Sequence, residues 1–98
     1  MVETLTTQTT SKPGVALVIG AGDATGGAIA RRFARAGLVA CVTRRNADRL
    51  EPLLAQIRDE GGVAHGFGSD ARDEDAVVAL VEQIESTIGP IEVMVFNI

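Results

Sequence analysis

Residue types that often build reactive sites are scarce in this sequence of 98 residues, which has one cysteine, one histidine and three aromatic residues. A single cysteine, Cys41, excludes a disulfide framework and a cysteine-rich zinc site. Cys41 falls within an apolar run, where we expect a buried and unreactive thiol. His65 is also alone, so we expect no metal site and place this residue on a half-exposed strand.

Net positive charge and long apolar runs are lacking too. The formal charge is −4 and only Phe33, Phe67 and Phe96 are aromatic, which disfavours a nucleic-acid-binding surface. No apolar run approaches the ~18 residues that span a membrane, and the N-terminus lacks the features of a secretory signal. We therefore expect a cytoplasmic protein with neither nucleic acid nor a membrane as partner.

Residues 1 to 13 differ in composition from the rest of the chain. They are rich in threonine, show no apolar periodicity and end in Lys12-Pro13. This composition predicts a disordered leader. The remaining residues, 14 to 98, are enough for one domain and too few for two.

Within residues 14 to 98, four short apolar runs alternate with three helical patterns. The order β-α-β-α-β-α-β predicts an α/β fold with a doubly wound, Rossmann-like parallel sheet. The first and fourth runs are nearly all apolar, as expected for strands covered by helices on both faces. We expect strands at residues 15–19, 38–43, 63–67 and 91–96, and helices at residues 24–36, 46–60 and 73–88.

Glycine and proline set the expected helix ends. Gly37 is the expected C-cap of the first helix, and Gly61-Gly62 and Gly89-Pro90 end the second and third. Pro52 would cost ~3 kcal/mol in a helix interior. We therefore expect the regular part of the second helix to start near Asp48, which puts the proline close to its first turn.

The segment Gly20 to Gly27 is the strongest functional signal, because it joins the first strand directly to the first helix. Glycine lets the backbone approach a ligand closely, and a helix N-terminus presents N–H groups and partial positive charge to an anion. This combination suits a diphosphate, although a glycine-rich turn alone is a weak signal. The predicted contacts from this segment are Gly20, Gly22, Asp23, Ala24, Thr25 and Gly26.

The end of the second strand offers a second test, because a dinucleotide site needs a group for the adenosine ribose there. An acidic residue suits the free 2′-hydroxyl of NAD, and a basic residue suits the 2′-phosphate of NADP. The sequence has Thr43, Arg44 and Arg45 at this point, about 20 residues after the first glycine. These residues favour NADP and disfavour NAD, unless the two arginines are simply solvated.

The third and fourth strands also end in polar residues. Asp70 could accept a hydrogen bond from the adenine amino group, or it could be a turn or helix-capping residue. Asp73 is an alternative cap. Asn97 follows the fourth strand at the edge where open parallel sheets bind ligands, or it simply caps that strand.

Together these residues resemble the N-terminal half of the short-chain dehydrogenase/reductase family over about residues 14 to 98. The loop of that family reads Thr-Gly-x-x-x-Gly-x-Gly. Gly20 and Gly26 match its first and last glycines, whereas Ile19 and Ala24 replace the threonine and the middle glycine, and Gly22 adds another glycine.

Three further positions carry the resemblance. Asp70 looks like the aspartate of the family after its third strand, and Ala71 is then a backbone contact of the cofactor. Asn97 looks like the second asparagine of the family's Asn-Asn-Ala-Gly segment. Arg44 stands where NADP-preferring members have a basic residue.

The resemblance implies an NADP-dependent oxidoreductase that moves hydride between nicotinamide and a small carbonyl or alcohol substrate. The serine and the Tyr-x-x-x-Lys motif of the family have no counterpart, because the sequence has no tyrosine and its only lysine is Lys12. We expect this to be the cofactor-binding part of a longer polypeptide, with no catalytic residue of its own and an unpaired apolar edge at residues 91–96. A homo-oligomer is a further expectation for the complete protein.

Two alternatives remain. The first is a non-catalytic nucleotide-binding fragment or partner subunit. The second is a different ligand, ATP or a methyl donor, which is disfavoured because the loop lacks Gly-Lys-Ser/Thr and no acid follows the second strand.

Overall fold

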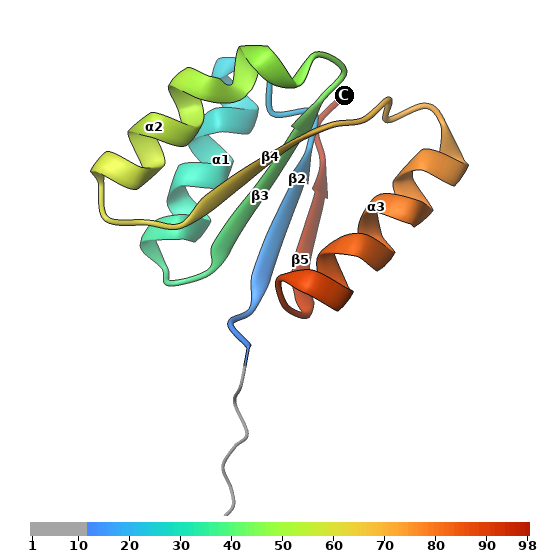
Figure 1. Cartoon of the computed structure of the whole chain (residues 1–98). Coiled ribbons are helices and arrows are strands. Elements are labelled where there is room, and N and C mark those ends of the chain that lie inside the picture. Colours follow the sequence, from blue (N-terminus) through green and yellow to red (C-terminus); the bar gives the residue numbers. More distant parts are fainter. Residues whose placement is uncertain (1–11) are drawn as a thin grey trace, which may run out of the picture.

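A parallel sheet of four strands forms the centre of the fold in the computed structural model, which describes residues 12–98 (Figure 1). Strands and helices alternate along the chain, as predicted. The elements are β2 (Val15–Ile19), α1 (Ala24–Arg35), β3 (Val39–Arg44), the 3₁₀ helix η2 (Ala47–Leu50), α2 (Glu51–Asp59), β4 (Ala64–Gly68), α3 (Glu74–Thr87) and β5 (Ile91–Phe96).

The strands lie in the order β4-β3-β2-β5, and every neighbouring pair is parallel. The chain thus moves outwards from β2 through β3 to β4 and then returns to the other side of β2. This reversal confirms the predicted doubly wound sheet. In such sheets ligands bind beyond the carboxyl ends of the strands at the point of reversal, which here lies between β2 and β5.

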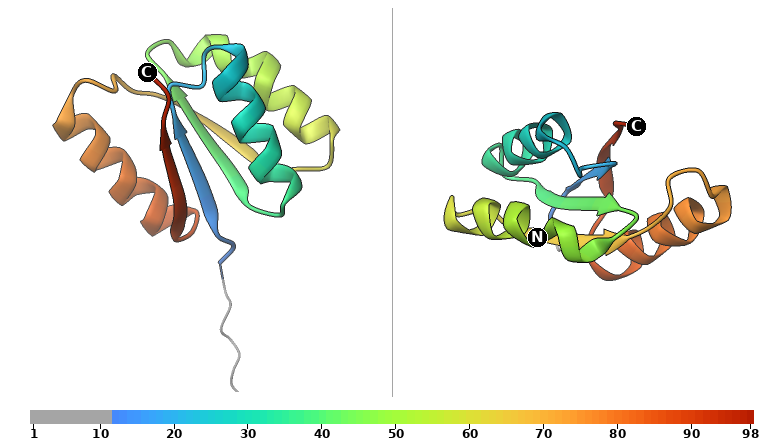
Figure 2. Two further views of the ribbon diagram at one scale, coloured as in Figure 1. Left: turned by 180° about the vertical axis from the view of Figure 1, so that it is seen from behind. Right: turned by 90° about the horizontal axis from the view of Figure 1, so that it is seen from above.

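Helices α1 and α2 lie on one side of the sheet, and α3 lies on the other (Figure 2). All five residues of β2 are buried, because this central strand is covered on both faces. Its alternate side chains divide between two apolar clusters. Val18 joins the cluster with α1 and α2, and Leu17 and Ile19 join the cluster with α3.

The predicted element ends need small corrections. Strands β3 and β4 each begin and end one residue later than predicted. The outermost predicted residues of two helices are caps: Ala36 ends α1, and Asp73 and Ile88 flank α3. Gly37, the predicted C-cap, is the next residue and has a φ of +98°, the left-handed conformation that often follows a helix C-terminus.

The second helix starts later than predicted. Pro52 does lie in its first turn, but α2 begins at Glu51 instead of near Asp48, and η2 precedes it. Proline has no N–H to donate to the carbonyl four residues earlier, so α-helical bonding cannot extend back through it and a tighter 3₁₀ turn forms instead. The Asn46 side chain starts this turn by accepting a hydrogen bond from the Asp48 N–H at 3.1 Å.

The expectation that helices cover both faces of the fourth strand is wrong. Met94 and Phe96 of β5 keep 41% and 54% of their surface exposed, whereas the corresponding residues of β2 are buried. Neither apolar cluster includes Met94 or Phe96, so no helix of the described residues covers them, and β5 is also an edge strand with β2 as its only neighbour in that part of the chain. The predicted unpaired apolar edge is therefore present.

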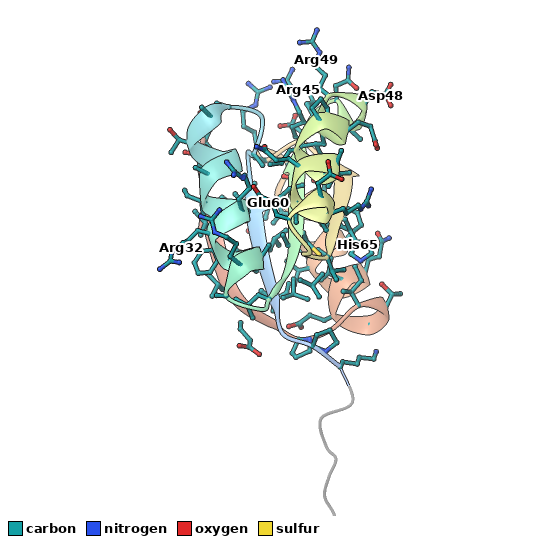
Figure 3. The ribbon with its side chains drawn as sticks, turned by 90° about the vertical axis from the view of Figure 1, so that its left-hand side faces the viewer. Arg32, Arg45, Asp48, Arg49, Glu60 and His65 are labelled. Atoms are coloured by element: carbon teal, nitrogen blue, oxygen red, sulfur yellow. The ribbon has the colours of Figure 1, made fainter. Side chains whose placement is uncertain are left out.

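Most of the predicted leader lies outside the described residues. Its last two residues, Lys12 and Pro13, lie beside the end of α3, where the Lys12 Nζ donates to the Ser86 carbonyl at 3.1 Å. His65 is exposed on the edge strand β4 (Figure 3), which is partly buried and partly exposed, as predicted.

Cys41 is completely buried in β3, as predicted. Burial raises the pKa of its thiol to about 11, because the thiolate would lose its hydration. The thiol therefore stays protonated in the folded chain at neutral pH.

We predict that Cys41 reacts with a disulfide reagent at pH 8 at least about a hundredfold more slowly in the native chain than in denaturant, since the reactive thiolate is both scarcer and shielded. The measurement is the rate at which the reagent releases its thiol, with and without denaturant. Equal reaction rates in the two states would contradict the buried position.

The same pKa shift makes the stability of the chain depend on pH. The Cys41 thiol of the unfolded chain ionises at a lower pH than that of the folded chain, so the free energy of unfolding falls as the pH rises from 9 towards 11.

Candidate functional site

The glycine-rich turn is attached to the end of β3. The N–H groups of Gly20 and Ala21 donate to the Thr43 carbonyl at 3.2 and 2.8 Å, and the Gly20 N–H also reaches the Thr43 hydroxyl at 3.3 Å. Thr43 is almost fully buried, so its hydroxyl contacts the turn from the interior of the molecule. Gly20 has a φ of +88°, and a Cβ there would collide with the Asn97 carbonyl, so only glycine suits this position.

Asn97 attaches the same turn to the end of β5. Its backbone N–H donates to the Ile19 carbonyl at 2.8 Å and continues the strand pairing. Its side-chain Nδ2 donates to the Gly20 carbonyl at 2.9 Å and to Oδ1 of Asp23 at 3.0 Å. Asn97 therefore does more than end its strand, because its amide fixes the turn from the side opposite Thr43.

Asp23 is the N-cap of α1. Its Oδ1 accepts the Gly26 N–H at 2.7 Å. That hydrogen bond, followed by the one from Asn97, holds the pKa of the Asp23 carboxyl below its ordinary value. One of the N–H groups at this helix N-terminus is thus already bonded within the chain, since the Asp23 carboxylate accepts it.

The two glycines Gly26 and Gly27 of α1 differ in how closely other atoms approach them. A Cβ on Gly26 would come within 2.6 Å of the Gly20 carbonyl oxygen and 2.9 Å of the Asn97 Nδ2. A Cβ on Gly27 would instead make an ordinary contact with Leu53 at 3.4 Å. Gly26 is therefore required by the packing of the turn itself.

A cavity of about 660 Å³ lies at the carboxyl ends of the strands, beside this turn. Its lining combines residues from the ends of all four strands, which the fold brings to one edge of the sheet. The lining residues are Gly20, Gly22, Asp23, Thr43, Arg44, Arg45, Asn46, Arg49, Ser69, Asp70, Ala71, Arg72, Asn97 and Ile98.

Arginines give this cavity its charge. Arg44, Arg45, Arg49 and Arg72 line it together with only two acids, although the whole chain has a formal charge of −4. The Arg44 guanidinium lies against the open side of Gly22, where a Cβ would be 2.9 Å from its Cζ. Arg45 and Arg49 project at the same end of the molecule (Figure 3). The cavity is thus suited to an anion.

Asp70 forms a turn after β4. Its Oδ1 accepts the Arg72 N–H at 3.0 Å and lies 3.4 Å from the Arg72 Nε. The pKa of Asp70 is lowered, first by that N–H and then by the side chain of Arg72. Asp73, the alternative cap, accepts the Ala76 N–H at 3.2 Å and caps α3. Asp70 therefore does not cap the helix, and its other carboxylate oxygen remains available at the cavity.

The structure brings most of the predicted site residues together around this cavity. Ala24, Thr25 and Gly26 do not line it. Gly26 is buried under the turn, and Ala24 lines a second cavity of about 370 Å³ between α1 and α2. Sequence reasoning missed the lining residues Asn46, Arg49, Ser69, Arg72 and Ile98. Proximity to a strand end is the signal that could have identified four of them, while Arg49 reaches the cavity only through the η2 turn.

Residues 12–98 contain no group of three or more histidine, cysteine, aspartate or glutamate residues that could hold a metal ion. No helix among these residues is both long enough and apolar enough to cross a bilayer.

Comparison with known proteins identifies the family. The family model described as short chain dehydrogenase matches residues 14–98. The chain belongs to the short-chain dehydrogenase family. The match covers the glycine turn, the arginines after β3, Asp70 and Asn97, on which the resemblance in sequence was based.

Individual members of the short-chain dehydrogenase family agree with this assignment. A short chain dehydrogenase of Pseudocercospora fijiensis is 38% identical over 81 residues, which cover 82% of this chain. The crystal structure of a short-chain dehydrogenase from Rhodopseudomonas palustris is 40% identical over 87% of this chain, with a TM-score of 0.82. An actinorhodin polyketide ketoreductase variant, solved with NADPH, is 36% identical over 87% of this chain, with a TM-score of 0.79.

The chain is much shorter than these short-chain dehydrogenases. It spans 26% of the length of the curated relative and 40% and 33% of the two solved chains. The similarity thus concerns the part of the fold that includes the glycine turn and the cavity.

We predict that Gly26→Ala destabilises the chain by about 1–3 kcal/mol, because the added methyl group overpacks the junction of turn and helix. Gly27→Ala is the matched control. It should be neutral or stabilising by up to about 1 kcal/mol, because alanine favours the helix and the methyl group has room. Urea unfolding of the two variants measures the difference, and equal losses at both positions would contradict the close contact of Gly26.

Proposed function

We propose that residues 14 to 98 are the NADP-binding part of a short-chain oxidoreductase that transfers hydride between nicotinamide and a small carbonyl or alcohol substrate. The observation that carries this proposal is the arginine-lined cavity beside the glycine turn. It combines a close backbone approach with positive charge, which are the two requirements of a phosphorylated dinucleotide.

The site can be divided according to the parts of the dinucleotide. In this proposal the diphosphate lies along the turn at Gly20 and Gly22, which have no side chains of their own, and the Arg44 guanidinium lies beside Gly22. The adenine lies near Asp70 and Ala71. The cofactor supplies or accepts the hydride, and the chain binds and orients it.

The preference for NADP rests on the end of β3. The residues at that strand end, Thr43, Arg44 and Arg45, include no carboxylate that could accept the ribose hydroxyls of NAD. The guanidinium of Arg44 lies against Gly22, and Arg45 also lines the cavity. Guanidinium groups bind phosphate with paired, charge-assisted hydrogen bonds, so Arg44 and Arg45 are the proposed ligands of the 2′-phosphate. The NADPH bound to the actinorhodin ketoreductase variant supports this choice by analogy.

A non-catalytic nucleotide-binding fragment or partner subunit is the second candidate. The observation that favours it is the absence of tyrosine from the sequence, together with a single lysine, Lys12. The coding sequence beyond Ile98 separates the two candidates. A Tyr-x-x-x-Lys motif there supports the oxidoreductase, and its absence together with tight NADPH binding by the chain supports the second candidate. A cytoplasmic location and a homo-oligomer remain predictions from the sequence.

We predict that Arg44→Ala weakens NADPH binding by about tenfold or more, because a charge-assisted hydrogen bond contributes roughly 1.5–3 kcal/mol. Binding of NADH should change much less, since it has no 2′-phosphate. Titration of both cofactors by fluorescence measures the two dissociation constants.

Arg32→Ala is the matched control for this experiment. Arg32 is exposed on α1 and projects away from the cavity (Figure 3), so its loss removes the same charge without removing a ligand. It should leave both affinities nearly unchanged. Equal losses of NADH and NADPH binding in Arg44→Ala would overturn the assignment of the 2′-phosphate.

A further inference from the structure

Asp23 lies where the proposed diphosphate would bind. It lines both the main cavity and the smaller cavity between α1 and α2, and its carboxylate lies at the N-terminus of α1. The Gly26 N–H at 2.7 Å and the Asn97 Nδ2 at 3.0 Å both bind Oδ1, so the position of the carboxylate is fixed from two sides.

Within residues 12–98 the Asp23 carboxylate forms no ion pair, although Arg44 lies against the neighbouring Gly22. Asp70, the other acid of the cavity, is paired with Arg72. The lowered pKa of Asp23, caused first by the Gly26 N–H and then by Asn97, keeps the group ionised at neutral pH.

Two effects of Asp23 oppose an anion at this position. The carboxylate occupies the Gly26 N–H, which a phosphate oxygen could otherwise use. Its charge also repels a second negative group within a few ångströms, and both effects act at the end of α1 where the helix dipole would attract a phosphate.

We infer that the Asp23 carboxylate weakens the binding of the nucleotide diphosphate and so limits the affinity of this cavity for every nucleotide that has one. The inference rests on the proposed function, since it assumes that the diphosphate lies along the glycine turn. Asp23 is in this view a residue that sets affinity, and Arg44 and Arg45 must offset its repulsion.

The test removes the negative charge of residue 23 and keeps a side chain that can cap α1. Asparagine and serine are as good N-caps as aspartate, so Asp23→Asn and Asp23→Ser retain an acceptor for the Gly26 N–H. Each variant is titrated with NADPH, ADP and adenosine, and circular dichroism verifies the fold. We expect NADPH and ADP to bind on the order of threefold to tenfold more tightly to both variants at low salt. The affinity for adenosine, which has no phosphate, should stay unchanged, and the gain should shrink as salt is added.

Asp48→Asn is the matched control for charge. Asp48 lies on η2 at the same end of the molecule and projects outwards (Figure 3), but it lines neither cavity. Its replacement changes the net charge of the chain by the same amount. We expect it to leave the ADP affinity within about twofold of the original, because an exposed charge at a distance is largely screened.

Three outcomes would overturn the inference alone, with NADPH binding to the unmodified chain intact. The first is an unchanged ADP affinity in both Asp23 variants. The second is an equal gain in Asp48→Asn, which would indicate a general effect of net charge. The third is a weakening of ADP and adenosine alike, which would make Asp23 an acceptor of ribose hydroxyl groups. If the unmodified chain binds neither NADPH nor ADP, the proposed function and the inference both fail.

Discussion

The hydrogen bonds that join the glycine turn to its two neighbouring strands are the constraint on which the rest of the site depends. Thr43 holds the turn from β3, and Asn97 holds it from β5. Thr43 and Asn97 both hold the start of the turn, and Asn97 also holds the Asp23 cap, so the first residue of α1 has a defined position and the helix dipole points at one place beyond the sheet. The cavity follows from this arrangement, since its floor is the turn and its walls are the strand ends.

Positive and negative side chains are distributed unevenly over the molecule. On the outer side of α1, Arg31 is hydrogen-bonded to Glu60 at the end of α2, and Arg35 lies 4.0 Å from the same carboxylate. At the cavity, by contrast, arginines outnumber acids. A chain with a formal charge of −4 therefore has a positive region at the edge of the sheet. Such a region attracts an anionic nucleotide even though the molecule as a whole repels it.

The sequence predicts the fold well because each element carries a local signal. The unbroken apolar run of β2 predicts a strand buried on both faces, and β2 has the predicted bounds. Pro52 predicts that α2 starts late, but it does not predict the start at Glu51. The reason is that the preceding 3₁₀ turn has no apolar periodicity of its own. The exposure of Met94 and Phe96 depends on which helices pack over β5, and the composition of a strand does not contain that information.

The site was less predictable, because its decisive contacts join distant parts of the chain. The glycines and Arg44 could be identified from spacing, but the role of Asp23 as a cap shared with Asn97 could not. The bond from Asn97 to Gly20 spans 77 positions of the sequence. Such a contact forms only after β5 has docked beside β2, and closing a loop of that length is slow compared with forming a helix turn. This separation sets an order of folding. The turn can form locally, but it becomes rigid only when β5, the last strand of the described sheet, is in place. Binding of a ligand to the turn would therefore report that the whole sheet has assembled.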